Sequence, residues 1–74
     1  MRDLYANIKT KADLDSFITN GLLTEDEEKI LRLSYAGKSR LEISFNMNMS
    51  VGAIDRRIRQ IKKKYNNIFP DVDI

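Results

Sequence analysis

Four hydroxyl side chains, each placed where a helix can begin, constrain the fold of this chain more than any other sequence feature. They are Thr10, Thr24, Ser39 and Ser50. Thr24 with Glu27 and Ser39 with Glu42 have the spacing of a capping box, in which each side chain accepts a hydrogen bond from the other residue's backbone N–H. The one alternating stretch, residues 44–51, lies between two such helix starts. The sequence therefore predicts helices and no strand.

Helix-stop signals between these caps divide the chain further. Leu4, Tyr5 and Ile8 have the spacing of a short first helix, and Thr10 begins a second. We expect the second helix to end at Asn20-Gly21, with Gly21 in the positive-φ conformation that suits a helix C-terminus. Gly37 ends the third helix, and the last and longest helix is predicted over about Val51 to Asn66. The predicted fold is all-α, a small bundle of four to five short helices.

Composition excludes several classes of protein. A chain of 74 residues has room for one small domain and no deep substrate cavity. It has no cysteine and no histidine, the commonest thiolate ligand and general base, and no glycine-rich phosphate loop. The acidic run Glu25 to Glu28 is explained by the positive end of a helix dipole. We expect no enzyme, metal, cofactor, small-molecule substrate or membrane partner, and a cytoplasmic location.

Charge is segregated along the chain. Residues 1–37 hold five basic and seven acidic side chains, a net charge of −2, and residues 66–74 hold two acidic ones. Residues 38–65 hold eight basic and two acidic side chains, a net charge of +6. Such separation is typical of a protein that binds a polyanion.

The last predicted helix is amphipathic. At about 100° per residue, Ile58, Ile61, Tyr65 and Ile68 lie within about 40° of Ile54, which predicts one buried stripe. Gly52, Arg56, Arg59 and Lys63 lie on the opposite side. A solvated helix face is the simplest explanation of a charge run, but such faces usually mix signs for i,i+4 pairing, and Asp55 is the only acid available here.

The segments before and within this helix have the order of a helix-turn-helix: a short capped helix, a turn of about four residues and a longer capped helix. Ser44 is small enough to let the two helices approach closely. Because the second helix of this motif enters the major groove with its N-terminal residues, Gly52 and Ala53 would keep that end slim. Arginine suits bidentate reading of guanine, and lysine suits phosphate.

Residues 23–65 resemble the DNA-binding domain of LuxR-type regulators and, equally, region four of bacterial sigma factors. The shared positions form a spaced pattern over three helices: Leu23, Thr24, Glu27, Ile30, Leu31, Leu33, Gly37, Ser39, Glu42, Ile43, Met49, Ser50, Ile54, Ile61 and Lys64. The resemblance implies a tri- or tetrahelical DNA-binding domain with base contacts near Asp55, Arg56 and Arg59. Because the receiver, ligand-binding and polymerase-binding regions of full-length relatives have no counterpart here, we expect a free-standing module of the kind that prokaryotic mobile elements, phages and sporulation-type regulators encode.

Three departures from that pattern are visible. Asp55 stands where the family usually has a basic residue, so that it would either repel phosphate or read cytosine N4. Asn48 replaces the common turn glycine and can adopt the same backbone geometry. Leu41 and Phe45 replace polar residues on the short helix. We expect the N-terminal segment, through Leu4, Tyr5, Ile8 or Phe17, to cover this apolar pair; otherwise it is a partner-binding patch.

These patterns predict an interface with double-stranded DNA. The expected base contacts are Gly52, Asp55, Arg56 and Arg59, and the expected phosphate contacts are Lys38, Ser39, Arg40, Ser50, Ala53, Arg57, Lys62 and Lys63. The predicted function is a sequence-specific transcription regulator. The alternative is a protein-interaction module of the same fold that binds RNA polymerase, a sigma factor or another regulator.

The chain is predicted to divide into an N-terminal extension at 1–22, the helix-turn-helix domain at 23–66 and a tail at 67–74. One module makes few DNA contacts, so a homodimer on a two-fold site is expected. The C-terminal apolar residues, which include Tyr65, Ile68, Phe69, Val72 and Ile74, would either form the dimer surface or fold back onto the core.

Overall fold

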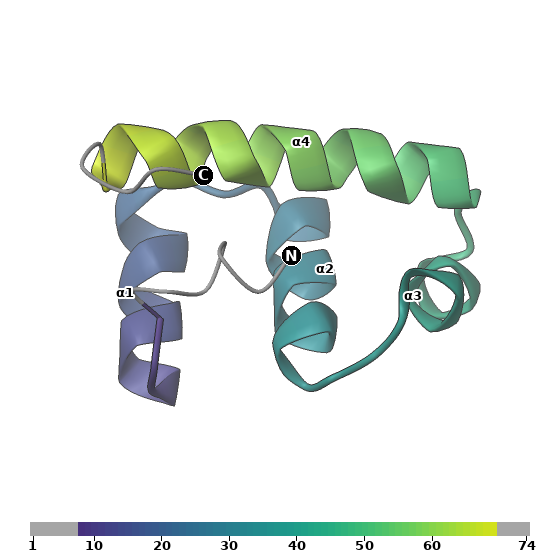
Figure 1. Ribbon diagram of the computed structural model, residues 1–74, viewed down its shortest axis with the longest axis horizontal. Helices are drawn as coiled ribbons and strands as arrows, with labels where there is room; N and C mark the ends of the chain where they lie inside the picture. Colours follow the sequence, from purple (N-terminus) through teal and green to yellow (C-terminus); the bar gives the residue numbers. More distant parts are fainter. Residues whose placement is uncertain (1–7, 70–74) are drawn as a thin grey trace.

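The computed structural model describes residues 8–69, which form four α-helices. They are α1 at Lys11–Asn20, α2 at Glu25–Tyr35, α3 at Arg40–Met47 and α4 at Val51–Ile68. The three shorter helices lie along one side of α4: α1 near its C-terminal end, α2 near its middle and α3 near its N-terminal end (Figure 1). Residues 8–69 contain no strand, so the predicted small all-α bundle is confirmed.

Each helix begins at the hydroxyl residue that the sequence indicated. The Thr24 and Ser39 side chains accept hydrogen bonds from the backbone N–H groups of Glu27 and Glu42, each at 3.2 Å, and both capping boxes are complete. Thr10 caps α1 and Ser50 caps α4. Sequence reasoning missed that Thr10 also forms a capping box, with Asp13, because an aspartate was not considered at that position.

The end of α1 differs from the prediction. Gly21 has a φ of −80°, and the left-handed residue is Leu22, with a φ of 54°. Glycine is required at position 21 for space instead: a Cβ there would lie 2.8 Å from the Phe17 carbonyl oxygen. Gly37, by contrast, has a φ of 92° after α2. Leu4 and Tyr5 of the predicted first helix lie outside the described residues, and Ile8 is buried but not helical.

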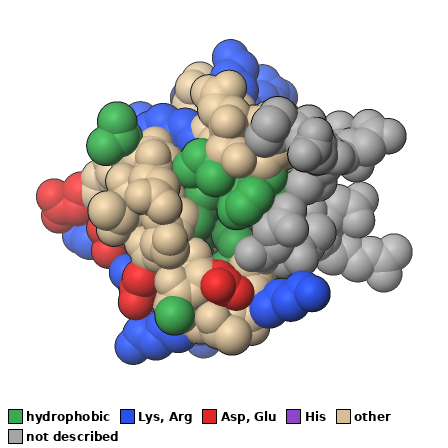
Figure 2. Space-filling model, turned by 90° about the vertical axis from the view of Figure 1, so that its left-hand side faces the viewer, with side chains coloured by type: hydrophobic (Ala, Val, Ile, Leu, Met, Phe, Trp, Pro, Cys, Tyr) green, Lys and Arg blue, Asp and Glu red, His purple; other side chains and the backbone are tan. Residues whose placement is uncertain are grey.

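The apolar stripe of α4 forms the centre of the core. Ile54, Ile58, Ile61 and Tyr65 are buried, and Ile68 packs against them partly exposed, as the periodicity predicted. Tyr65 also joins an aromatic cluster, with its ring centroid 5.5 Å from that of Phe17 and 4.8 Å from that of Phe69. Figure 2 views the end of the molecule from the side of α1 and shows apolar side chains at the centre of this face with charged ones near its edge.

The aromatic cluster bears on the two roles considered for the C-terminal residues. Tyr65 is fully buried, and Ile68 and Phe69 pack on the core, so these three fold back onto the monomer. Val72 and Ile74 lie outside the described residues. A dimer surface built on Tyr65 would require the core to open.

The expected cover of Leu41 and Phe45 is wrong for the residues that can be placed. Ile8 and Phe17 lie in the core, and Phe17 belongs to α1 at the far end of α4 from α3 (Figure 1). Leu41 remains 57% exposed and Phe45 76% exposed. The pair is therefore an apolar patch on the surface of α3.

None of the helices within residues 8–69 combines the length and the apolar character that crossing a bilayer requires.

Candidate nucleic-acid interface

The cationic side of α4 faces solvent. Arg56, Arg59 and Lys63 are exposed on the side of the helix opposite the buried isoleucines, and Lys62 is half-buried at its edge. Among the ion pairs of residues 8–69, none engages any of these four side chains. The like charges of Arg56, Arg59 and Lys63 repel one another at helical spacing, and Asp55, the one acid within α4, is paired with Arg40 instead.

The two cations of α2 are paired. Arg32 of α2 bonds both Asp15 at 2.8 Å and Glu28 at 3.0 Å, and Lys29 lies 3.5 Å from Glu25. Within residues 8–69, both cations of α2 are thus paired, whereas Arg56, Arg59 and Lys63 of α4 are not. Lys9, Lys11 and Lys38 also form no ion pair there, so the distinguishing feature of the α4 cations is that three of them share one side of one helix.

The connection between α3 and α4 has the geometry of a tight turn. Asn48 adopts the left-handed conformation, with φ 55° and ψ 43°, as expected for a residue that replaces glycine there. The Met49 N–H donates to the Ser44 carbonyl at 3.0 Å and closes the end of α3. Ser44 is buried, and its hydroxyl donates to the Leu41 carbonyl at 2.7 Å, so a small polar residue is accommodated where the two helices meet.

The first turn of α4 is open to solvent. Gly52 is exposed, and a Cβ added there would meet nothing within 4 Å. Packing within the monomer therefore does not require glycine at this position. A slim helix end leaves the backbone accessible to a large ligand, which is consistent with the sequence prediction for Gly52 and for the half-buried Ala53.

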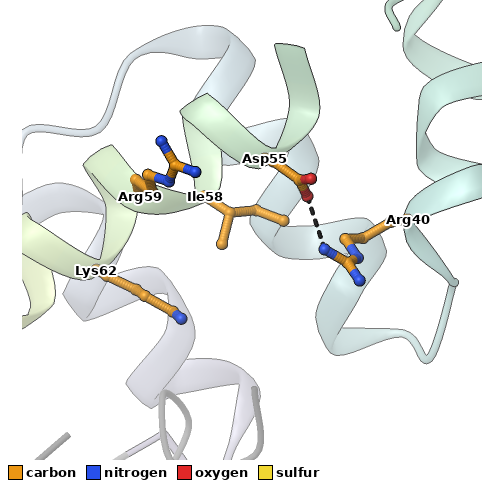
Figure 3. Close-up of a pocket in the computed structure, with 5 residues that line it drawn as sticks. All are labelled: Arg40, Asp55, Ile58, Arg59 and Lys62. Carbon is orange, nitrogen blue, oxygen red and sulfur yellow. Dashed lines mark hydrogen bonds and ion pairs between the residues drawn. The ribbon is translucent and has the colours of Figure 1, made fainter. Parts of the chain in front are cut away.

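A groove of about 280 Å³ runs between the start of α3 and the middle of α4. Its lining brings together Arg40, Asp55, Arg59 and Lys62 around Ile58 (Figure 3). Arg40 donates through Nη1 to Asp55 Oδ1 at 2.9 Å, which ties α3 to α4. Asp55, which the sequence predicted as a base contact, is thus already paired with Arg40. Sequence reasoning found neither this ion pair nor the role of Ile58 as the apolar floor of the groove.

A second groove, of about 320 Å³, lies on the other side of α4. It is lined by Met49, Ala53, Arg56, Arg57 and Gln60. Gln60 was missed as a candidate, although it follows Arg56 by one helical turn and its amide can both donate and accept. Arg57 lies 3.7 Å from Asp26 of α2. Both side chains are about half exposed, so this long pair contributes at most about 1 kcal/mol and leaves Arg57 free to exchange partners.

Lys64 differs from its basic neighbours because it points inward. Its Nζ lies 2.5 Å from Glu27 Oε1 and also donates to the Leu22 carbonyl at 3.2 Å. The Glu27 side chain is almost fully buried and also accepts from the Thr24 N–H at 2.8 Å. Burial alone would raise the pKa of Glu27, but the hydrogen bonds from Lys64 and Thr24 and the charge of Lys64 outweigh it, and the pKa falls below its ordinary value.

The remaining predicted phosphate contacts are accessible. Lys38, Ser39, Arg40 and Ser50 are exposed, and the two serine side chains act as N-caps. Each capping oxygen accepts from a backbone N–H, so each hydroxyl proton remains available for donation to another acceptor. Within residues 8–69, no group of three acidic side chains is placed to hold a metal ion, and this includes the Glu25 to Glu28 run.

No family model, curated protein or solved structure matches this chain. The resemblance to LuxR-type and sigma region-four domains therefore stays a prediction from the spaced residues alone.

Proposed function

We propose that this chain is a sequence-specific, double-stranded DNA-binding transcription regulator whose helix α4 enters the major groove. Arg56 and Arg59 read base edges, with Gly52 giving the backbone room to approach. Lys62, Lys63 and the capping serines contact phosphates on either side. We propose a binding role, not a catalytic one, because the exposed face offers cations and hydroxyls but no nucleophile–base pair.

The observation that carries this proposal is that Arg56, Arg59 and Lys63 form no ion pair within residues 8–69 and share the side of α4 opposite its buried isoleucine stripe. An array of guanidinium and ammonium groups without counter-charges is destabilising in the free protein and favourable against a polyphosphate backbone. The tight turn between α3 and α4 supports the proposal that these cations belong to the recognition helix of a helix-turn-helix motif.

The experiment that tests the proposal is selection of bound duplexes from a random DNA pool, followed by titration at several salt concentrations. We expect an enriched sequence and an affinity that falls linearly with the logarithm of salt concentration, because phosphate neutralisation releases counterions. A two-fold symmetric sequence would indicate a homodimer. An unenriched pool, or an affinity that ignores salt, would reject the proposal.

The exposed pair Leu41 and Phe45 favours a second candidate function, contact with a protein of the transcription machinery. Single exposed apolar side chains are common on protein surfaces, but Leu41 and Phe45 lie one helical turn apart on the same helix and form a contiguous patch of the kind that marks protein contacts. This contact would be compatible with DNA binding, since the pair lies on α3 and the unpaired cations lie on α4.

Replacing Leu41 and Phe45 together by serine tests that candidate. Both side chains are exposed, so we expect the free energy of unfolding to change by less than about 1 kcal/mol and duplex affinity to stay within about twofold. Regulatory activity in cells should fall if a protein partner is required. Unchanged activity in cells would contradict the partner role and leave DNA binding as the whole function.

A further inference from the structure

The Arg40–Asp55 ion pair is placed where it can affect a bound ligand more than the stability of the fold. Arg40 is the first residue of α3, and Asp55 lies in the second turn of α4. The two side chains are 61% and 35% exposed. A pair with that much solvent contact contributes little to stability, typically well under the free energy of one buried side chain. Its main physical effect is to restrict where the arginine points.

The side chains that line the groove beside this pair are those expected of an anion-binding site. Arg40, Arg59 and Lys62 supply three positive charges and Asp55 one negative charge, which leaves a net charge of +2. Ile58 is buried between them and lowers the local polarity, which strengthens interactions with charge. In Figure 3 the three cationic side chains surround Ile58, and the Asp55 carboxylate is directed at Arg40.

Arginine is suited to serve two partners at once. The guanidinium has five N–H donors, and Asp55 engages Nη1. The remaining donors can bind a phosphate in the forked geometry that this group prefers. An unrestrained arginine at a helix start would lose side-chain entropy when it bound, whereas one already held by a carboxylate loses less.

We infer that Asp55 is a positioning residue: it holds Arg40 so that Arg40, Arg59 and Lys62 converge on one phosphate of bound double-stranded DNA in the α3–α4 groove. This inference rests on the proposed DNA binding and replaces the base-reading role that the sequence suggested for Asp55. It also explains why an acid is placed at a DNA-facing position, where its charge alone would oppose binding.

Asp55→Asn separates this role from simple electrostatics. The matched control is Asp15→Asn, which also removes a carboxylate that pairs with an arginine, here Arg32 at 2.8 Å, but between α1 and α2. Both changes raise the net charge by one unit. The probe is a fluorescently labelled 20-base-pair duplex, measured by anisotropy with wild type, both variants, Arg40→Ala and the double variant Asp55→Asn with Arg40→Ala.

The expected result is that Asp55→Asn weakens duplex binding by about two- to tenfold although it adds positive charge, because Arg40 must then be ordered on binding. Asp15→Asn should leave affinity unchanged or slightly tighter. In the Arg40→Ala background, Asp55→Asn should no longer weaken binding. Inorganic phosphate at millimolar concentration should compete no better than its ionic strength predicts, since the groove is used together with the rest of a duplex.

Three outcomes would overturn the inference while leaving the proposed function intact. Tighter binding by Asp55→Asn would mean that the carboxylate only repels phosphate. Equal weakening with and without Arg40 would mean that Asp55 contacts the DNA itself. Strong competition by inorganic phosphate would mean that the groove binds free anions. Failure of the wild-type chain to bind the duplex in a salt-dependent way would instead reject the proposed function.

Discussion

At the scale of single residues, the buried Glu27 shows how one side chain can join three parts of the fold. Its carboxylate completes the capping box of α2 and accepts from Lys64 of α4, which also bonds the carbonyl after α1. Removing one partner of such a pair leaves an uncompensated charge with little solvent around it. Lys64 is thereby used for stability, whereas Lys62 and Lys63 form no ion pair within residues 8–69.

Glu27 gives the chain a defined response to acid. Its pKa is lowered in the folded state below the ordinary value of 4.5, so its contribution to stability is complete above that value and is lost as the pH falls through the folded pKa. We expect urea unfolding of the wild type to show a steeper loss of stability than Glu27→Gln shows as the pH falls below about 4.5. At pH 7, Glu27→Gln should be less stable by about 2–4 kcal/mol.

The control for this prediction is Glu25→Gln, which removes an acid from the same helix turn. Glu25 is 84% exposed and lies 3.5 Å from Lys29, so we expect its loss to change stability by less than about 0.5 kcal/mol. Equal effects of the two changes would contradict the role of Glu27 as a buried link between α2 and α4.

At the scale of helices, local chemistry made most of the fold predictable. The caps at Thr24, Ser39 and Ser50 and the isoleucine stripe of α4 depend on neighbours within one or two turns, so the sequence contains the information needed to find them. The Arg40–Asp55 ion pair and the exposure of Phe45 could not be predicted from neighbouring residues in the sequence. Both depend on the crossing of α3 with α4 and on where α1 packs, which are properties of tertiary arrangement.

The end of α1 illustrates the same limit. Glycine at position 21 suggested a left-handed turn residue, but the carbonyl of Phe17 and the side chain of Leu23 come too close for a Cβ there. The left-handed conformation falls on Leu22, a residue that is 82% exposed. A glycine that is needed for space and a glycine that is needed for a positive φ therefore look the same in the sequence.

The start of α4 permits stability and function to be changed separately. Ser50 caps the helix by accepting from the Ala53 N–H at 3.1 Å and is a proposed phosphate contact. Ser50→Ala should cost about 1 kcal/mol of stability, measured by thermal or urea unfolding, because that N–H loses its partner. Ser50→Asp should keep the cap and the stability but weaken duplex binding, since a carboxylate would face phosphate. Unchanged DNA affinity in Ser50→Asp would contradict the placement of this turn against the backbone.

At the scale of the whole molecule, the described residues combine a shared core with an uneven distribution of charge. Tyr65, Phe17 and Phe69 fix α1 to the C-terminal half of α4, and this leaves the other half of the helix, with α3, free on one side. Because Tyr65 is buried, it is not available to a partner, whereas Ile68 and Phe69 stay partly exposed. Arg56 and Arg59 lie in the N-terminal half of α4, and the exposed cationic side continues to Lys63 in the C-terminal half.

The measurement that tests the central claim most directly is the affinity for a labelled duplex, measured against salt concentration, of Arg56→Ala with Arg59→Ala. Its control is Lys9→Ala with Lys11→Ala, which removes the same charge from exposed positions at the start of α1. The proposal predicts at least a tenfold loss of affinity at constant salt and a shallower salt dependence for the arginine variant, with the lysine control within about twofold of wild type. Equal losses in the two variants, or wild-type binding that does not change with salt, would contradict the claim that the free face of α4 binds DNA.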